Sequence, residues 1–204
     1  MKIDNRKFVY LISPNKISKD FYNQLDIVLK SKKISFFQLR LKNYNFKKKL
    51  NIGVKLKKIC KKNNVLFIIN DDVLLAKKLG ADGCHLGQKD MKIQEARKII
   101  GNKIIGITCH NSIRLVNKAT KEKANYVALG AFYSTKTKKT RFKANISILR
   151  KVKKFAKVPV IAIGGIKLEN YKKLLLNKAD FLAISSYIWN NKNFNPQEAI
   201  KKLK

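Results

Sequence analysis

The 204-residue chain is 45% hydrophobic, which suits a single domain, residues 1–204, with a sizeable core. Its formal charge of +35 attracts polyanions, so nucleic acid has to be weighed as a partner. Three scattered cysteines without CxxC spacing argue against a disulfide framework, polar residues 1–7 argue against a signal peptide, and no apolar run approaches the ~18 residues of a membrane helix. We therefore expect a cytoplasmic protein without membrane contact.

Apolar runs of strand length alternate with helical patterns along the chain. The predicted strands cover residues 8–12, 34–41, 65–69, 83–86, 103–108, 126–129, 158–163 and 181–185. The predicted helices cover residues 19–30, 46–62, 73–79, 93–100, 113–121, 146–156, 168–176 and about 196–203. This alternation predicts an α/β fold, a single-domain TIM (β/α)8 barrel, although the chain is short for one. The alternative is a doubly wound open sheet, but no GxGxxG follows the first strand.

Residues 66–90 carry two aspartates just past the ends of two successive predicted strands. Asp71 follows the apolar run 65–69, and Asp90 lies in the polar turn after the strand 83–86. Parallel neighbouring strands lie about 4.8 Å apart, so the two carboxylates could share one hard cation. Magnesium fits, because it takes one or two carboxylates and completes its shell with water and substrate phosphate. The alternative is that Asp71 caps a helix and Asp90 is solvated.

The other predicted strands also end in groups suited to phosphate. Gln38, Arg40 and Lys42 alternate along one strand, so their side chains point the same way, and two cations with an amide suit a diphosphate. Thr108 ends the fifth predicted strand, with His110 just beyond it. A polar segment, 130–143, follows the sixth, and we expect it to close over substrates as a mobile lid. Gly164-Gly165 and Ser185-Ser186 follow the last two, where many barrels bind phosphate.

Each of these residues also has a structural interpretation. Arg40 could be an ion-pair partner inside the protein, and His85 is expected to be a hydrogen-bonded core histidine rather than a ligand. Gly164-Gly165 could serve only a tight turn. The 47 basic residues are almost all lysine and are spread over the predicted helices, which is typical of a solvated surface and predicts no specific nucleic-acid site.

Seven segments in order resemble the thiamine-phosphate synthase family, also called thiamine-phosphate pyrophosphorylase. They are QLRLK (38–42), IIND (68–71), GADGCHLGQKD (80–90), GITCH (106–110), LGAFYSTKTK (129–138), IAIGGI (161–166) and AISS (183–186). The resemblance spans most of the chain and implies a transferase of thiamine biosynthesis. In that reaction a hydroxymethylpyrimidine diphosphate loses pyrophosphate with the help of Mg²⁺, and the nitrogen of a thiazole phosphate attacks its exocyclic methylene carbon to give thiamine phosphate.

The resemblance also implies roles for residues at matching positions. Asp71 and Asp90 would bind Mg²⁺, and Arg40, Lys42 and Lys138 would be catalytic. The substrate-binding set would be Gln38, Leu39, Arg40, Leu41, Lys42, Asn70, Thr108, Thr135, Lys136, Thr137, Lys138, Gly165, Ile184 and Ser185. The implied partners are the two small-molecule substrates, with a homo-oligomer left open.

The chain departs from the family pattern at two places. Thr108 stands where the family usually has serine, which keeps a hydroxyl, and Gly130-Ala131 stands where the family has Gly-Pro. Two rival functions are a related thiazole tautomerase, whose histidine base would lie near His110, and a nucleic-acid-binding protein. The joint presence of Asp71, Asp90 and Lys138 argues against the tautomerase.

Overall fold

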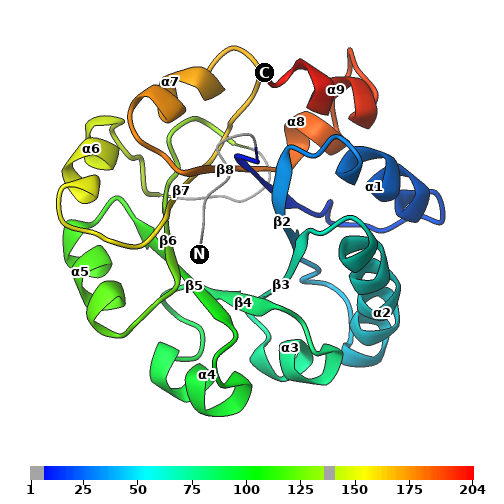
Figure 1. The fold of residues 1–204 in the computed structure, drawn as a ribbon, viewed down its shortest axis with the longest axis horizontal. Coiled ribbons are helices and arrows are strands. Elements are labelled where there is room, and N and C mark those ends of the chain that lie inside the picture. The colour runs from blue at the N-terminus through cyan, green and yellow to red at the C-terminus, as the bar shows by residue number, and fades with distance from the viewer. Residues whose placement is uncertain (1–6, 136–140) are drawn as a thin grey trace.

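A computed structural model describes residues 7–135 and 141–204 of the chain. Within these residues eight parallel strands pair in sequence order and close into a barrel, with β1 next to β8. The helices form an outer ring around the strands, as Figure 1 shows along the barrel axis. The predicted TIM barrel is therefore confirmed, and the open sheet is excluded.

The strands are short and largely buried. They are β1 (Val9–Ile12), β2 (Ile34–Leu39), β3 (Leu66–Asn70), β4 (Gly83–Leu86), β5 (Ile104–His110), β6 (Tyr126–Gly130), β7 (Val160–Ile163) and β8 (Phe181–Ile184). The helices are α1 (Phe21–Leu29), α2 (Phe46–Lys62), α3 (Val73–Leu79), α4 (Ile93–Ile100), α5 (Ile113–Lys121), α6 (Ser147–Lys153), α7 (Tyr171–Leu176), α8 (Ser186–Trp189) and α9 (Pro196–Lys202).

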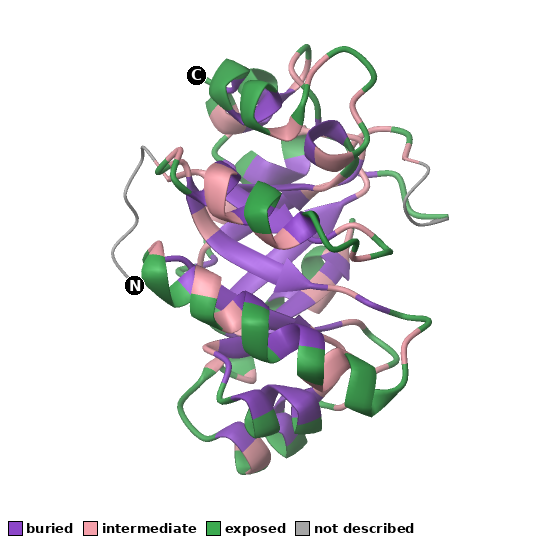
Figure 2. Ribbon diagram, turned by 90° about the vertical axis from the view of Figure 1, so that its right-hand side faces the viewer, coloured by how far each residue is buried: buried purple, intermediate pink, exposed green. Residues whose placement is uncertain are grey.

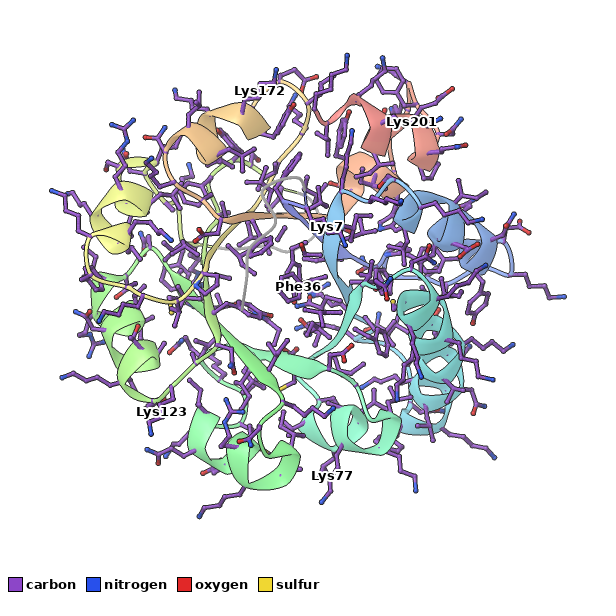
Figure 3. The ribbon with its side chains drawn as sticks, in the orientation of Figure 1. Lys7, Phe36, Lys77, Lys123, Lys172 and Lys201 are labelled. Carbon is purple, nitrogen blue, oxygen red and sulfur yellow. The ribbon has the colours of Figure 1, made fainter. Side chains whose placement is uncertain are left out.

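Alternation along the strands separates two apolar cores. Side chains that point inward fill the barrel with a small cluster: Tyr10, Ile12, Phe36, Ile68, Tyr126, Ala128, Ile161, Phe181 and Ala183. The side chains between them point outward and form a larger cluster with the helices, whose outer faces are exposed (Figure 2). The barrel is therefore packed at its centre, where Phe36 lies, while lysines such as Lys77 and Lys172 project outward (Figure 3).

Contacts between the two ends of the chain close the barrel. Val9 of β1 lies in register with Leu182 of β8, and the indole Nε1 of Trp189 donates to the carbonyl of Ile12 at 2.7 Å. The Lys33 ammonium, from the loop before β2, binds the carbonyl oxygens at the end of α9, which are those of Ile200, Lys201 and Leu203 at 3.4, 2.9 and 2.5 Å. These contacts hold the last helix against the first quarter of the chain.

Several predicted boundaries differ from the observed ones, each for a local reason. β7 begins at Val160 rather than at 158, because Pro159 has no N–H for the ladder and contributes only its carbonyl, to Val127. α7 begins at Tyr171 because Asn170 closes a turn on Lys167, whose N–H binds the Asn170 side chain at 2.9 Å. The four-residue α8 was not predicted, since so short a helix carries no periodicity.

In the described part of the chain, every helix is too short or too polar to cross a bilayer.

Candidate active site

A cavity of about 890 Å³ opens at the carboxyl ends of the strands. Every strand contributes to its lining, which is the arrangement expected for a barrel whose functional groups follow its strands. Most of the predicted site residues line it. They are Gln38, Arg40, Lys42, Asn70, Asp71, Asp90, Thr108, Thr135, Gly165, Ile184 and Ser185.

The other five predicted site residues fall into two groups. Leu39 and Leu41 are buried in the outer core between strands and helices, so only their backbone could contact a substrate. Lys136, Thr137 and Lys138 lie outside the described residues, so their predicted roles stay predictions.

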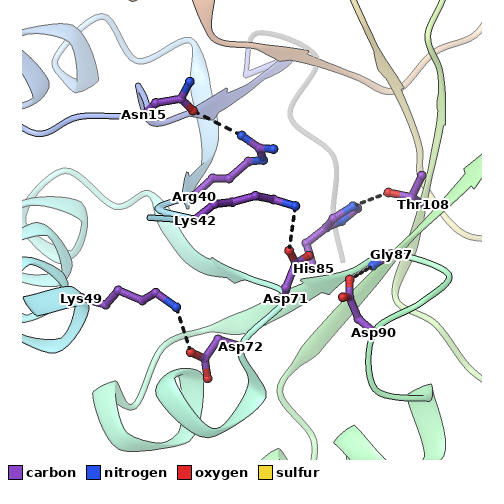
Figure 4. A network of polar contacts seen from close by, with 10 residues as sticks. All are labelled: Asn15, Arg40, Lys42, Lys49, Asp71, Asp72, His85, Gly87, Asp90 and Thr108. Atoms are coloured by element: carbon purple, nitrogen blue, oxygen red, sulfur yellow. Dashed lines mark hydrogen bonds and ion pairs between the residues drawn. The ribbon is translucent and has the colours of Figure 1, made fainter. Parts of the chain in front are cut away.

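The end of β2 directs two cations toward the cavity (Figure 4). The Arg40 backbone N–H donates to the Ser13 hydroxyl at 2.9 Å, and its guanidinium donates to Asn15 Oδ1 at 3.3 Å. Burial lowers the pKa of the guanidinium from its usual value, and the Asp71 carboxylate opposes that shift. Lys42 Nζ lies 3.8 Å from Asp71 Oδ2, and its side chain is 55% exposed, so this contact is loose. Both cations can turn to an anionic ligand.

Asp71 and Asp90 face each other across the ends of β3 and β4. Burial, a hydrogen bond with Asp90 and the Asp90 charge raise the pKa of Asp71 to about 6, while Lys42 and Arg40 oppose the shift. Asp90 Oδ2 also accepts the Gly87 N–H at 2.6 Å. Two carboxylates this close compete for one proton, and a divalent cation between them would remove that competition. The donor set therefore fits Mg²⁺.

The geometry rejects the structural interpretation of Asp71. The residue that caps α3 is Asp72, whose side chain accepts the Leu75 N–H at 2.9 Å and pairs with Lys49 at 3.4 Å. Asp71 instead adopts φ of 63°, with its N–H on the His85 carbonyl at 2.8 Å, which directs its carboxylate to the cavity. Within residues 7–135 and 141–204 no cluster of three or more His, Cys, Asp or Glu side chains could hold a metal ion, so this pair would rely on substrate oxygens as further ligands.

The loop after β6 packs directly on the glycine pair after β7. The Phe132 and Tyr133 N–H groups donate to the carbonyls of Ile163 and Gly164, both at 3.1 Å. Gly165 has φ of 62°, and a Cβ there would lie 2.3 Å from the Ser134 carbonyl oxygen. The pair is therefore needed for more than a tight turn, because it admits the segment that carries Thr135 to the cavity.

The expected lid, 130–143, has a fixed base in its described part. Ala131 donates to the Phe142 carbonyl at 3.1 Å, and Ala144 donates back to the Ala131 carbonyl at 2.9 Å. The His110 ring stacks on Phe142 at 4.0 Å between centroids. Residues 136–140 lie outside the described residues, so closure over substrates stays a prediction.

His85 is hydrogen-bonded, as expected, yet it also lines the cavity. Its Nδ1 lies 3.0 Å from the Tyr126 hydroxyl and its Nε2 lies 2.9 Å from Thr108 Oγ1. Tyr126 and Tyr10 line the same cavity and were not predicted to. Period-two alternation places Tyr10 with Ile12 on one face of β1 and Tyr126 with Ala128 on one face of β6, but only the closed barrel shows that these faces point inward.

Comparisons with known proteins agree on one family. A family model described as thiamine monophosphate synthase matches residues 9–188. The thiamine-phosphate synthase of Pelagibacter ubique is 65% identical over 98% of this chain and 97% of its own length, and that of Erythrobacter litoralis is 37% identical over 89% and 87%. The structure of thiamine phosphate pyrophosphorylase from Pyrococcus furiosus superposes with a TM-score of 0.86 at 29% identity, covering 98% of this chain and 94% of that one. The chain belongs to the thiamine monophosphate synthase family.

Proposed function

We propose that this protein is a transferase that joins hydroxymethylpyrimidine diphosphate to thiazole phosphate, releasing pyrophosphate and forming thiamine phosphate. The observation that carries the proposal is the meeting of Asp71 and Asp90 with Arg40 and Lys42 in one cavity. Two anions and two cations from three strand ends form a site for a metal-bound diphosphate, and relatives with that activity cover nearly the whole chain. We take residues 1–204 as one catalytic domain.

The diphosphate half of the reaction needs positive charge at the leaving group. The methylene carbon–oxygen bond breaks with its electron pair moving to pyrophosphate, so charge develops on that oxygen. Arg40 and Lys42 lie where they can stabilise it, and we assign Lys138 the same role on the resemblance alone. Gln38, Asn70 and Thr108 line the adjacent wall and would hold the pyrimidine ring.

Asp71 and Asp90 would hold Mg²⁺. When bound, this ion supplies charge neutralisation for the departing diphosphate. The two side chains can each offer an oxygen, and the Gly87 N–H bound to Asp90 Oδ2 fixes the direction of that carboxylate.

The thiazole phosphate would bind on the opposite wall, near the ends of β6, β7 and β8. Thr135, Gly165, Ile184 and Ser185 line this wall, and we add Lys136 and Thr137 from the resemblance. The attacking thiazole nitrogen carries no proton, so the bond to the methylene carbon forms without a general base. The site therefore needs no catalytic histidine or cysteine.

The rival tautomerase function has one observation on its side, which is that His110 lines the cavity. Its ring stacks on Phe142, however, and the carboxylate pair that such a reaction does not use is kept in place. We favour the transferase for that reason.

We further propose that the protein works in the cytoplasm, where its three buried free cysteines would remain reduced. Whether it forms a homo-oligomer is answered by light scattering of the purified chain, with a single-chain mass excluding one.

The decisive experiment is an assay with both substrates, with and without Mg²⁺. We expect thiamine phosphate only when both substrates and the metal are present, and loss of product after chelation with recovery on adding Mg²⁺ back. Product formed equally well after chelation would refute the metal role. Turnover of a thiazole isomer without the pyrimidine substrate would support the tautomerase instead.

A further inference from the structure

A chain of hydrogen bonds crosses the barrel interior between residues that line the cavity. Gln38 Nε2 donates to the Tyr10 hydroxyl at 2.9 Å, and the Tyr10 and Tyr126 hydroxyls lie 2.8 Å apart. The Tyr126 hydroxyl lies 3.0 Å from His85 Nδ1, and His85 Nε2 lies 2.9 Å from Thr108 Oγ1. We call these five residues the relay. It joins Gln38 of β2 to Thr108 of β5, two residues that we assign to the binding of the pyrimidine ring.

The backbone is shaped to admit the centre of the relay. Gly106 of β5 lies in register with Tyr126 of β6, and a Cβ on Gly106 would lie 1.9 Å from Tyr126 Cζ. Any other residue at 106 would displace the phenol ring. The His85 ring stacks on the Tyr126 ring with centroids 5.6 Å apart. Tyr126 is therefore held in one position, and its hydroxyl contacts both the Tyr10 hydroxyl and His85 Nδ1.

The hydrogens along the relay can be assigned by counting donors. Burial raises the pKa of the Tyr10 and Tyr126 hydroxyls above the usual value, so both keep their single hydrogen. The Gln38 amide nitrogen can only donate, so Tyr10 accepts from it. Within the described residues the Tyr10 hydroxyl has no third partner, so its own hydrogen goes to Tyr126, and the Tyr126 hydrogen goes to His85 Nδ1.

The direction of these hydrogen bonds decides whether the relay offers a donor or an acceptor to a ligand at each of its two ends. A neutral His85 that accepts at Nδ1 carries its hydrogen on Nε2 and donates it to Thr108 Oγ1. Among residues 7–135 and 141–204 the Thr108 hydroxyl has no other partner, so its own hydrogen is available to the cavity that Thr108 lines. At the other end the Gln38 amide oxygen is left as an acceptor. A pyrimidine nitrogen has a lone pair and no hydrogen, so it needs the donor that Thr108 offers.

We propose that the relay holds His85 as its Nε2–H tautomer and thereby fixes Thr108 as a hydrogen-bond donor to the pyrimidine ring. Tyr126 and His85 are positioning residues in this scheme, because they act through Thr108 and Gln38. The role in catalysis rests on the proposed function, whereas the tautomer itself does not. The direct test of the tautomer therefore needs no substrate.

The tautomer can be read by ¹⁵N NMR, because the chain has only two histidines. A His110→Gln variant removes one set of signals and assigns the other to His85. We expect the Nε2–H form of His85 in the native protein and its loss as the predominant form in Tyr126→Phe, which keeps the ring over Gly106. A native His85 with its hydrogen on Nδ1, or a tautomer unchanged in Tyr126→Phe, would overturn the proposal.

Kinetics give the second readout. Tyr126→Phe should raise KM for the pyrimidine diphosphate roughly five- to tenfold, the effect of one misdirected hydrogen bond, while KM for the thiazole phosphate stays unchanged. Tyr10→Phe should also raise the first KM, by freeing Gln38, yet should leave His85 as Nε2–H, since Tyr126 can still donate to it. Equal KM values in Tyr126→Phe and the native protein would refute the positioning role.

Tyr187→Phe is the matched control. The Tyr187 hydroxyl is buried and makes no hydrogen bond within the described residues, so its removal tests loss of a buried hydroxyl outside the relay. We expect neither the NMR nor the kinetic change in this variant. If the native protein makes no thiamine phosphate at all, the proposed function fails, and the NMR outcome still decides the relay.

Discussion

The two ends of the barrel differ in the partners of their carboxylate and amide side chains. Before β4, β6 and β8, at the end opposite the cavity, Asp82, Asn125 and Asp180 each accept a backbone N–H from the preceding strand, those of Phe67, Ile105 and Val160, at 2.7, 2.8 and 2.7 Å. We call these three residues the floor. At the cavity end, Asp71 lies beside Asp90, and burial together with this neighbouring carboxylate raises the pKa of Asp71. At the floor the protein's own N–H groups pair with each carboxylate or amide oxygen, whereas at the cavity end two carboxylates lie side by side, as the proposed metal site requires.

The floor is also repetitive, which the cavity end is not. Each floor residue follows a buried alanine, and each alanine follows a residue with positive φ at a helix end: Gly80, Lys123 and Lys178, at 55°, 62° and 75°. The same local solution therefore joins helix to strand three times. Repetition of this kind serves stability, whereas the unlike residues at the other end serve chemistry.

The largest effect should come from removing one charge of the cavity pair. Asp90→Asn keeps an oxygen for the Gly87 N–H but cannot match the carboxylate toward Mg²⁺, so turnover should fall about a hundredfold or more. Thermal unfolding without metal should stay the same or improve, since the competition with Asp71 is removed. Unchanged turnover and metal dependence would show that the pair does not hold the ion.

The opposite result is expected at the floor. Asp180→Ala removes the acceptor for Val160 N–H and the partner of Lys153 Nζ at 2.9 Å, which should cost about 2–3 kcal/mol of folding free energy. The midpoint temperature of thermal unfolding should fall by roughly 5–10 °C, while kcat/KM should stay nearly unchanged. Asp180→Asn is the control, because Asn125 already fills the same role at β6. A loss of turnover without a loss of stability in Asp180→Ala would contradict the view that the floor contributes to stability and the cavity end to activity.

A smaller effect should appear in how stability and Mg²⁺ binding depend on pH. The pKa of Asp71 is raised to about 6, so the folded state binds this proton more tightly than the unfolded chain. The contribution of the Asp71 proton to the free energy of unfolding is present at low pH and is lost as the pH rises through about 6. Mg²⁺ competes with that proton, so its apparent dissociation constant should rise about tenfold between pH 7 and pH 5. Calorimetric titration measures this, and a dissociation constant that stays the same from pH 7 to pH 5 would show that Mg²⁺ does not displace this proton.

The smallest effect concerns the lysine residues on the outer surface, which are spread around the barrel. Lysines such as Lys77 of α3, Lys201 of α9 and Lys123 in the turn after α5 project outward on different sides of the barrel (Figure 3). Mobility-shift titration at about 150 mM salt should therefore show only weak, sequence-independent binding of nucleic acid. Tight binding to one defined sequence would give this surface a function of its own.

The sequence predicted the barrel because its strands are apolar on both faces and its helices on one. It predicted Asp71, Asp90 and Arg40 for the cavity because parallel strands deliver their ends to the same side. It did not predict the cavity positions of Tyr10 and Tyr126, because a tyrosine inside an apolar run does not show which way it points. That direction depends on the closed barrel and its register.

It also could not separate neighbours within one motif. In QLRLK the resemblance covers all five residues, yet Leu39 and Leu41 turn to the outer core. Among adjacent aspartates, Asp72 caps α3 and Asp71 faces the cavity. A positive φ at Asp71 makes that difference, and no pattern of residue types encodes it.

The closure of the barrel sets an order of events during synthesis. β1 has no second neighbour until β8, and Lys33 has no carbonyls to bind until α9 exists. At the usual pace of about 5–20 residues per second, the β1 edge waits on the order of ten seconds or more for its partner. Until β8 is made, the first strand keeps one edge open, and an exposed strand edge is the part of a nascent protein that chaperones have most reason to cover.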